Sequence, residues 1–439
     1  MKKSGLVQTV SKQILEKEES YMKKSLILGA AAMAAMVAAP QADASEISLG
    51  GYYQLRMMDS DATMLETAGD DNDKAWYHRM QLNVDAKVSE KSHAHLRIRP
   101  VDGSMATTGA NGLNSSATAA WSVKQVWMET EMYGVGVKVG HLPLRINDGI
   151  LIAHNGSGFS SIVLSKTFGD TTLVGLNNRV SEGATGAGDN TLTADDDDVD
   201  LYGLSVVGKI GSSSYQLTYA HLESGASSVL AGADNDWIAG TLGTSLGSVK
   251  LTGTVIWEGG QDGTTSANMQ AEDSGVLAAV RLSGKTGFGG WKGYGFYSSE
   301  DFTHPVGASN YHVWSLAWDQ GGVNGRDMLG GGWIGGTNSN ANFLQNVWSV
   351  GASLDIKAGS WTISPAIDYA SLVENNVDGL GAAISDSAWG GSLTATTKLD
   401  EGTTFSLIAI GASPSDDDNN ATPSVDNMHS LQAEFKIKF

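Results

Sequence analysis

Apolar and polar residues alternate along residues 76–88, and this alternation is the clearest pattern in the chain. Met80, Leu82, Val84 and Ala86 fall on one face at a period of two, while the residues between them are polar or charged. Successive side chains of a β-strand point to opposite faces, so the stretch predicts a strand with one apolar and one polar surface. Similar segments, each about 10 residues long, recur to the end of the chain.

The pattern predicts 18 strands. They cover residues 47–58, 76–88, 93–101, 122–132, 135–141, 160–168, 171–180, 199–210, 214–223, 235–246, 248–258, 273–285, 290–299, 344–357, 360–373, 386–399, 403–412 and 427–439. Short turns alternate with long loops rich in Gly, Asn, Asp and Ser. The segment 300–343 is ambiguous, because residues 311–318 fit either a strand or a loop, so 16 strands are the alternative count.

These features together predict an all-β fold, a transmembrane antiparallel β-barrel with short periplasmic turns and long external loops. Closure leaves no unpaired strand edge, which the hydrocarbon core of a membrane requires. A barrel of 16 to 18 strands is too wide for side chains to fill, so its lumen should hold water. Aromatic residues near strand ends would form the interfacial girdles. The candidates are Trp76, Tyr133, Trp237, Trp257, Trp291, Trp361 and Trp389.

Residues 22–44 have the three parts of a secretory signal peptide. Lys23 and Lys24 give the positive start, residues 25–39 the apolar run, and residues 42–44 a small-residue cleavage site. We therefore expect residues 1–44 to be a leader and cleaved signal peptide, and residues 45–439 to form a single barrel in the outer membrane of a Gram-negative bacterium.

Composition narrows the function further. The chain has no Cys, which excludes disulfides and covalent haem attachment, and its formal net charge of −20 argues against nucleic acid as a partner. The acidic balance favours a weak preference for cations. Acidic runs occur at 70–73, 195–198 and 416–418. The favoured interpretation is that they are solvated loop tips, and the alternative is that they bind calcium. No other cofactor is expected.

Basic residues gather on the polar faces of the first three predicted strands. Facing lipid near the middle of the membrane, one Arg would cost roughly 2–4 kcal/mol, so these residues should line the lumen. They could form a basic patch or simply belong to a polar wall. A metal site is the weaker interpretation for the histidines at 93 and 95, because no third ligand accompanies them. The basic candidates are Arg56, Arg79, His95, Arg97 and Arg99.

Residues 133–143 (YGVGVKVGHLP) resemble the general porin pattern that leads into the third external loop. In that family the loop folds into the barrel and narrows it. The resemblance implies that Arg145 and Asp148 lie at the pore constriction, opposite Arg79, Arg97 and Arg99. Opposed charges there would orient polar solutes. The family's loop often carries more than one acid, whereas this loop carries only Asp148.

Residues 431–439 (LQAEFKIKF) alternate strictly and end on Phe439. They resemble the closing strand of Gram-negative outer-membrane barrels, in which the terminal Phe is the signal read by the barrel insertion machinery. The whole chain is most similar to the homotrimeric porins of sulfate- and metal-reducing bacteria. That resemblance implies a homotrimer surrounded by outer-membrane lipid and lipopolysaccharide.

The leading interpretation is a non-enzymatic porin for passive diffusion of ions and small hydrophilic solutes. One alternative is the barrel sheath of a porin–cytochrome electron conduit, which would need a haem-protein partner. Another is an outer-membrane barrel enzyme, although no Gly-x-Ser-x-Gly motif lies beside the nine His residues. A sugar-specific porin would need a line of lumen aromatics, for which Tyr52, Tyr77 and Trp127 are the candidates.

Overall fold

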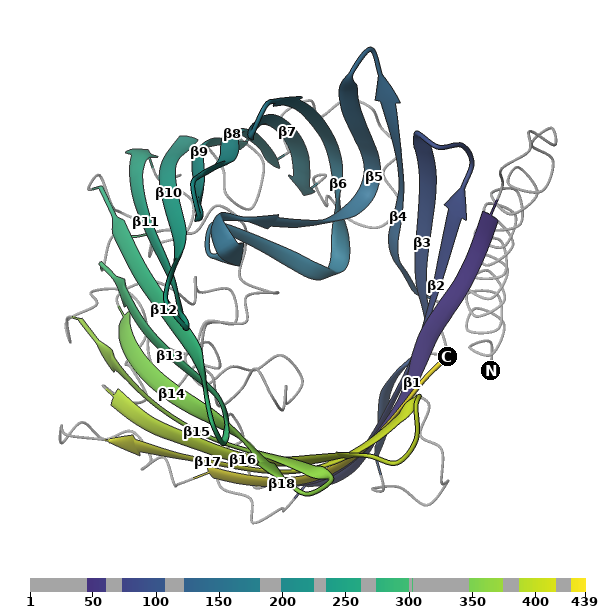
Figure 1. Cartoon of the computed structure of the whole chain (residues 1–439), viewed down its shortest axis with the longest axis vertical. Helices are drawn as coiled ribbons and strands as arrows, with labels where there is room; N and C mark the ends of the chain where they lie inside the picture. The colour runs from purple at the N-terminus through teal and green to yellow at the C-terminus, as the bar shows by residue number, and fades with distance from the viewer. Residues whose placement is uncertain are drawn as a thin grey trace, which may run out of the picture.

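The computed structural model describes residues 46–60, 73–106, 122–181, 199–224, 234–261, 274–299, 302, 347–373, 387–415 and 428–439. Eighteen antiparallel strands form one sheet, and β1 (Glu46–Ser60) pairs with both β2 (Asp73–Lys87) and β18 (Met428–Lys438). The sheet is thereby closed into a barrel (Figure 1). The predicted fold class and the count of 18 strands are confirmed. The ambiguous segment 311–318 and the predicted signal peptide lie outside the described residues.

The remaining strands follow in chain order and match the predicted segments to within a few residues, except around the third loop. Their bounds are β3 (Ser92–Ala106), β4 (Ser122–Met132), β5 (Val135–Ile146), β6 (Ile152–Phe168), β7 (Thr171–Ser181), β8 (Val199–Ile210), β9 (Ser213–Ser224), β10 (Asp234–Leu246), β11 (Val249–Gln261), β12 (Val276–Thr286), β13 (Gly289–Ser298), β14 (Val347–Ala358), β15 (Trp361–Leu372), β16 (Ser387–Lys398) and β17 (Thr403–Ser415).

The short connections are tight hairpin turns. Between β4 and β5, Tyr133 and Gly134 have φ values of 54° and 74°. Two successive positive φ angles characterise the turn whose twist matches that of the flanking strands. The short turns therefore hold neighbouring strands in the register that alternation requires, with one face polar and the other apolar.

The outer face of the barrel is apolar and the inner face polar. On β18, Leu431 is 58% exposed and points outward, whereas Gln432 is 4% exposed and points inward. An exposed band of Leu, Val and Ile suits lipid rather than water. In the part of the chain that the structure describes, no helix has the length and apolar character needed to cross a membrane.

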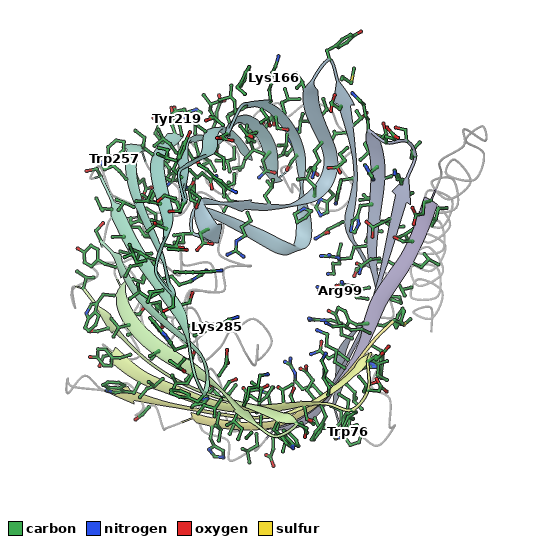
Figure 2. The ribbon with its side chains drawn as sticks, viewed as in Figure 1. Trp76, Arg99, Lys166, Tyr219, Trp257 and Lys285 are labelled. Carbon is green, nitrogen blue, oxygen red and sulfur yellow. The ribbon has the colours of Figure 1, made fainter. Side chains whose placement is uncertain are left out.

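One of the predicted girdle aromatics is placed differently. Trp257 points outward and is 42% exposed (Figure 2), but Trp237 faces inward and is 1% exposed. Trp237 pairs with Ala220 on β9 and has the same parity as buried Ala239. Its assignment to the membrane interface was wrong, because its place in the alternation puts it on the inner wall.

The C-terminus completes the closure of the barrel. The Gly51 N–H donates to the Phe439 carbonyl oxygen at 2.9 Å, and the Phe439 N–H donates to the Gly51 carbonyl oxygen at 3.2 Å. A Cβ on Gly51 would lie 2.2 Å from the Gln81 carbonyl oxygen and 3.0 Å from the Phe439 ring. Gly51 therefore allows the closing strand to approach. Recognition of Phe439 by the insertion machinery stays a prediction.

Candidate pore constriction

The segment predicted as a third loop that folds into the barrel does enter the lumen, but as a paired hairpin (Figure 1). Beyond the wall, β5 and β6 remain paired, with Leu144 opposite His154 and Ile146 opposite Ile152. The hairpin turns at η1 (Asn147–Gly149) and runs across the inside of the barrel toward β9 and β10 (Figure 1). Leu151 and Ile152 are fully buried, which explains why the segment is too apolar for a loop in water.

The hairpin tip is fixed to the barrel wall at β9 and β10. The Asn147 N–H donates to Gln216 Oε1 on β9 at 3.1 Å, and Asn147 Nδ2 donates to Thr241 Oγ1 on β10 at 3.1 Å. Asn147 and Asp148 have φ values of 51° and 58°, a left-handed conformation that Asn and Asp adopt more readily than most residues. The tip therefore has a defined position inside the lumen.

Asp148 lies between two arginines. Its Oδ1 is 3.0 Å from Arg145 Nη2, and its Oδ2 is 3.0 Å from Arg281 Nη1 on β12. The Arg145 side chain is 51% exposed and that of Asp148 is 25% exposed. The structure thus pairs Asp148 with Arg281, whereas the sequence led us to expect it opposite Arg79, Arg97 and Arg99.

The five basic candidates of the first strands share the inner wall. Arg79 pairs with Gln54, Arg97 with Asn83, and His95 with Asp85 across neighbouring strands. Figure 2 shows Arg99 pointing toward the barrel axis. Lys436 on β18 joins this side of the lumen, since it pairs with Gln54, and was missed from the sequence. We use the term basic strip for Arg56, Arg79, Arg97, Arg99 and Lys436.

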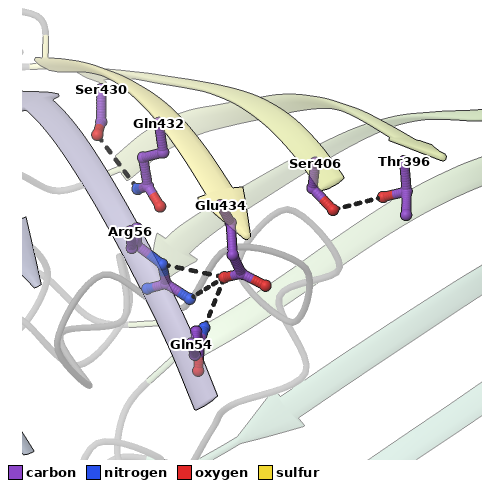
Figure 3. A network of polar contacts seen from close by, with 7 residues as sticks. All are labelled: Gln54, Arg56, Thr396, Ser406, Ser430, Gln432 and Glu434. Carbon is purple, nitrogen blue, oxygen red and sulfur yellow. Dashed lines mark hydrogen bonds and ion pairs between the residues drawn. The ribbon is translucent and has the colours of Figure 1, made fainter. Parts of the chain in front are cut away.

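A carboxylate is part of the same wall. Glu434 Oε2 accepts from Gln54 Nε2 at 2.6 Å and from Arg56 Nε and Nη2 at 3.1 and 2.8 Å (Figure 3). The Lys436 ammonium lies 4.4 Å from the centre of the Tyr52 ring. Contacts between β1 and β18 therefore hold Arg56 and Lys436 in place across the junction where the barrel closes.

His95 belongs to a separate cluster near the short turn between β2 and β3. His95 Nδ1 lies 2.5 Å from Asp85 Oδ1, and its ring stacks on Trp127 with centroids 5.2 Å apart. Lys138 Nζ is 4.7 Å from the centre of the Trp127 ring and 2.7 Å from Glu129 Oε2. Of the predicted lumen aromatics, Tyr52 and Trp127 both face inward. The side chain of Tyr77 is outside the described set.

The described residues do not bring together three His, Asp or Glu side chains in a way that could hold a metal ion. Calcium binding at the three acidic runs stays a prediction, because the side chains of these runs lie outside the described residues.

The chain is similar to known proteins in structure but matches none of them in sequence. No family model matches the chain, and neither does any curated protein. OpdK, an outer membrane protein of Pseudomonas aeruginosa, superposes with a TM-score of 0.56 at 11% identity, covering 90% of this chain and 98% of its own. A BenF-like porin from Pseudomonas fluorescens gives 0.55 at 12% identity, again over 90% and 98%.

A third neighbour is Pseudomonas aeruginosa OccK2 (OpdF), solved in complex with glucuronate. It superposes with a TM-score of 0.53 at 12% identity, covering 90% of this chain and 98% of its own. The fold of this chain is therefore that of the outer-membrane porins of Gram-negative bacteria. The identities are too low for the likeness to show more than the fold.

Proposed function

We propose that the chain is an outer-membrane porin, a non-enzymatic barrel whose water-filled channel passes small hydrophilic solutes and prefers anions to cations. The 18-stranded closed barrel supports the class, because a lumen of this size is wider than its side chains can fill. The hairpin across the lumen supports a selective passage, since it narrows the path without moving freely.

The ion pair between Asp148 and Arg281 is the observation that carries the anion preference. Asp148, the only acid on the hairpin tip, is also paired with Arg145, so two guanidinium groups share one carboxylate and a net positive charge remains beside the half-exposed Arg145. The basic strip lines another part of the lumen wall. Fixed positive charge beside a narrow aqueous path raises the local concentration of anions.

The net charge of −20 does not decide selectivity, although by itself it favours cations. Charges in solution are screened over about 10 Å at 0.1 M salt, so the groups nearest the permeating ion dominate. Arg145 and Arg281, which contact Asp148 at the hairpin tip, support this reasoning. The weak cation preference expected from composition is replaced in this proposal by an anion preference.

The remaining expectations from sequence belong to the same proposal. They are a homotrimer in outer-membrane lipid and lipopolysaccharide, insertion directed by Phe439, and membership among the porins of sulfate- and metal-reducing bacteria. The support for them is the resemblance of residues 133–143 and 431–439 to the corresponding porin segments. Crosslinking in native outer membranes would test this oligomeric state. If the protein is a homotrimer, we expect a crosslinked species of three chains.

Transport into proteoliposomes tests the solute class. Glucuronate and glucose have similar size and differ by a carboxylate, and one structural neighbour was solved with glucuronate bound. We expect labelled glucuronate to enter faster than labelled glucose. Equal or slower entry of glucuronate would contradict the anion preference. Entry of neither solute through a folded barrel would contradict the open channel and favour the cytochrome sheath or the barrel enzyme.

A further inference from the structure

The pairing between β4 and β5 stops before β4 ends. β4 pairs with β5 from Val126 to Met132, whereas its pairing with β3 extends as far as Ser122. The reason is that β5 leaves the wall, since its residues 144–146 belong to the hairpin inside the lumen. Among the described residues, no strand pairs with residues 122–124 on the side toward β5. The wall therefore has a short strand edge at the external end of β4.

The outer face around this edge lacks the external aromatic girdle. Elsewhere, exposed aromatic side chains lie near the strand ends that border long loops, and they include Tyr202, Tyr219, Trp257, Tyr297 and Trp389. Figure 2 shows Tyr219 and Trp257 pointing outward. Over β3–β7 the described outward side chains include no aromatic residue at that end, and Phe168 lies beside a short turn. A surface that faces lipid has aromatic residues at both interfaces.

We use the term girdle-free face for the outward side chains of β3–β7. Its exposed aliphatic residues include Val126, Met128, Val139, Ile162 and Leu164. A row of polar residues begins beside Val126 and continues in register across β5, β6 and β7 as His141, Ser160 and Arg179. An apolar centre bordered by polar residues is the composition of a protein–protein interface.

We propose that the girdle-free face is the surface on which a second copy of this chain docks. The proposal rests on the association of copies proposed above and names the face by which they meet. A second copy has the same orientation in the same membrane, so its apolar band lies at the same height. Protein also supplies hydrogen-bond partners for the edge of β4, which lipid does not.

The girdle-free face is large enough for such a contact. Its five strands, about 4.8 Å apart over an apolar band about 25 Å tall, present roughly 600 Å² on one copy. Two such faces would bury roughly 1,200 Å² in total, which is the lower limit for a specific interface.

Disulfide crosslinking tests the face, because the chain has no Cys of its own. One variant carries Met128→Cys and Ile162→Cys, with one strand between the two positions. The matched control carries Leu393→Cys and Leu431→Cys, which have the same spacing and similar exposure on the opposite side of the barrel (Figure 1). At two strand spacings, about 9.6 Å, neither pair can bond within one chain.

The variants would be oxidised in native outer membranes. We expect about tenfold more crosslinked chains from the Met128→Cys and Ile162→Cys variant than from the control, because a disulfide needs Cα atoms within about 7 Å. A lysine-reactive crosslinker on wild type shows separately whether copies associate. If it yields species of several chains while only the control forms disulfides, the girdle-free face is overturned and the association stands. If wild type yields single chains only, the association itself is overturned.

A second measurement does not depend on disulfide geometry. A fluorophore attached to Met128→Cys or to Leu393→Cys is placed in vesicles that contain brominated phospholipid, which quenches a fluorophore that it touches. We expect several-fold less quenching at position 128 than at position 393. Equal quenching and equal crosslinking on the two sides would overturn the proposal. Protection at position 128 without any crosslink would also overturn it and would indicate a different protein as the occupant.

Discussion

Asp148 at the tip of the inward hairpin and Arg281 on β12 form an ion pair with 3.0 Å between Oδ2 and Nη1. The pair joins two elements that are remote in the sequence, the hairpin formed by β5 and β6 and the wall strand β12. Together with the bonds from Asn147 to Gln216 and Thr241, it fixes the hairpin against the wall. It also determines which charge the hairpin presents to a passing ion.

Replacing Arg281 by Gln should weaken the anion preference. The substitution removes one positive charge beside the hairpin tip, and Arg145 is then the remaining arginine partner of Asp148. We expect the chloride-to-potassium permeability ratio to fall about fivefold in planar bilayers. Lys285→Gln is the matched control, because Lys285 faces the lumen from the same strand (Figure 2), whereas the β12 residue that contacts Asp148 is Arg281. Equal effects of the two variants would contradict a specific role for the ion pair.

Replacing Asn147 by Ala should loosen the hairpin. Asn147 loses its side-chain bond to Thr241, and Ala is unfavourable at a φ of 51°. A lost buried hydrogen bond costs about 1–3 kcal/mol, enough to populate displaced positions of the tip. Single-channel recordings should show larger and noisier open currents than those of wild type. Currents as steady as wild type would mean that other contacts suffice to hold the tip.

Replacing Glu434 by Gln should strengthen the anion preference. The amide still accepts from Arg56 and Gln54 but no longer offsets the guanidinium charge. We expect the chloride-to-potassium permeability ratio to rise about fivefold by the same electrostatic reasoning. Glu131→Gln is the control, since Glu131 lies beside the short turn that follows β4, on a strand that does not pair with β1 or β18, and it forms an ion pair with Lys91. A rise of equal size in the control would show that the effect is not local.

Asp400 should make one turn sensitive to acid. A side-chain hydrogen bond with Thr403 and the N–H groups of Gly402 and Thr403, at 2.9 and 2.7 Å from Oδ1, lower the pKa of this carboxyl group in the folded barrel. A depressed pKa stabilises the fold above the unfolded-state pKa, and this contribution disappears as the pH falls through the folded-state pKa.

The variant Asp400→Asn keeps an acceptor that does not titrate. Its unfolding midpoint in urea should therefore change less between pH 6 and acidic pH than that of wild type. The difference should be small, because the side chain is exposed and solvent screens it. Identical pH profiles for the two proteins would contradict the assignment.

The strands were predictable because their signal is local. Alternation along residues 122–132 and 199–210 gave the bounds of β4 and β8 without error. The same parity placed Arg97 and Arg99 on the inner wall. Trp237 was misplaced because a general preference of aromatics for the membrane interface was given more weight than its own position in the alternation.

The contacts between residues remote in the sequence were not predictable. Neither Arg281 nor Lys436 has a local feature that names Asp148 or Tyr52 as its neighbour, and both contacts depend on how the closed sheet brings remote strands together. The resemblance to porins implied that this segment enters the barrel. Its hairpin form was not foreseen, because the continued pairing of β5 and β6 inside the barrel depends on the wall it packs against.

The reversal potential of the wild-type channel in a KCl gradient tests the central claim most directly. The purified, folded barrel would be inserted into a planar bilayer with a tenfold higher KCl concentration on one side. We expect open-channel current whose reversal potential has the sign of chloride preference. The reason is that arginines outnumber carboxylates at the hairpin tip and along the basic strip. A reversal potential with the sign of potassium preference would contradict it.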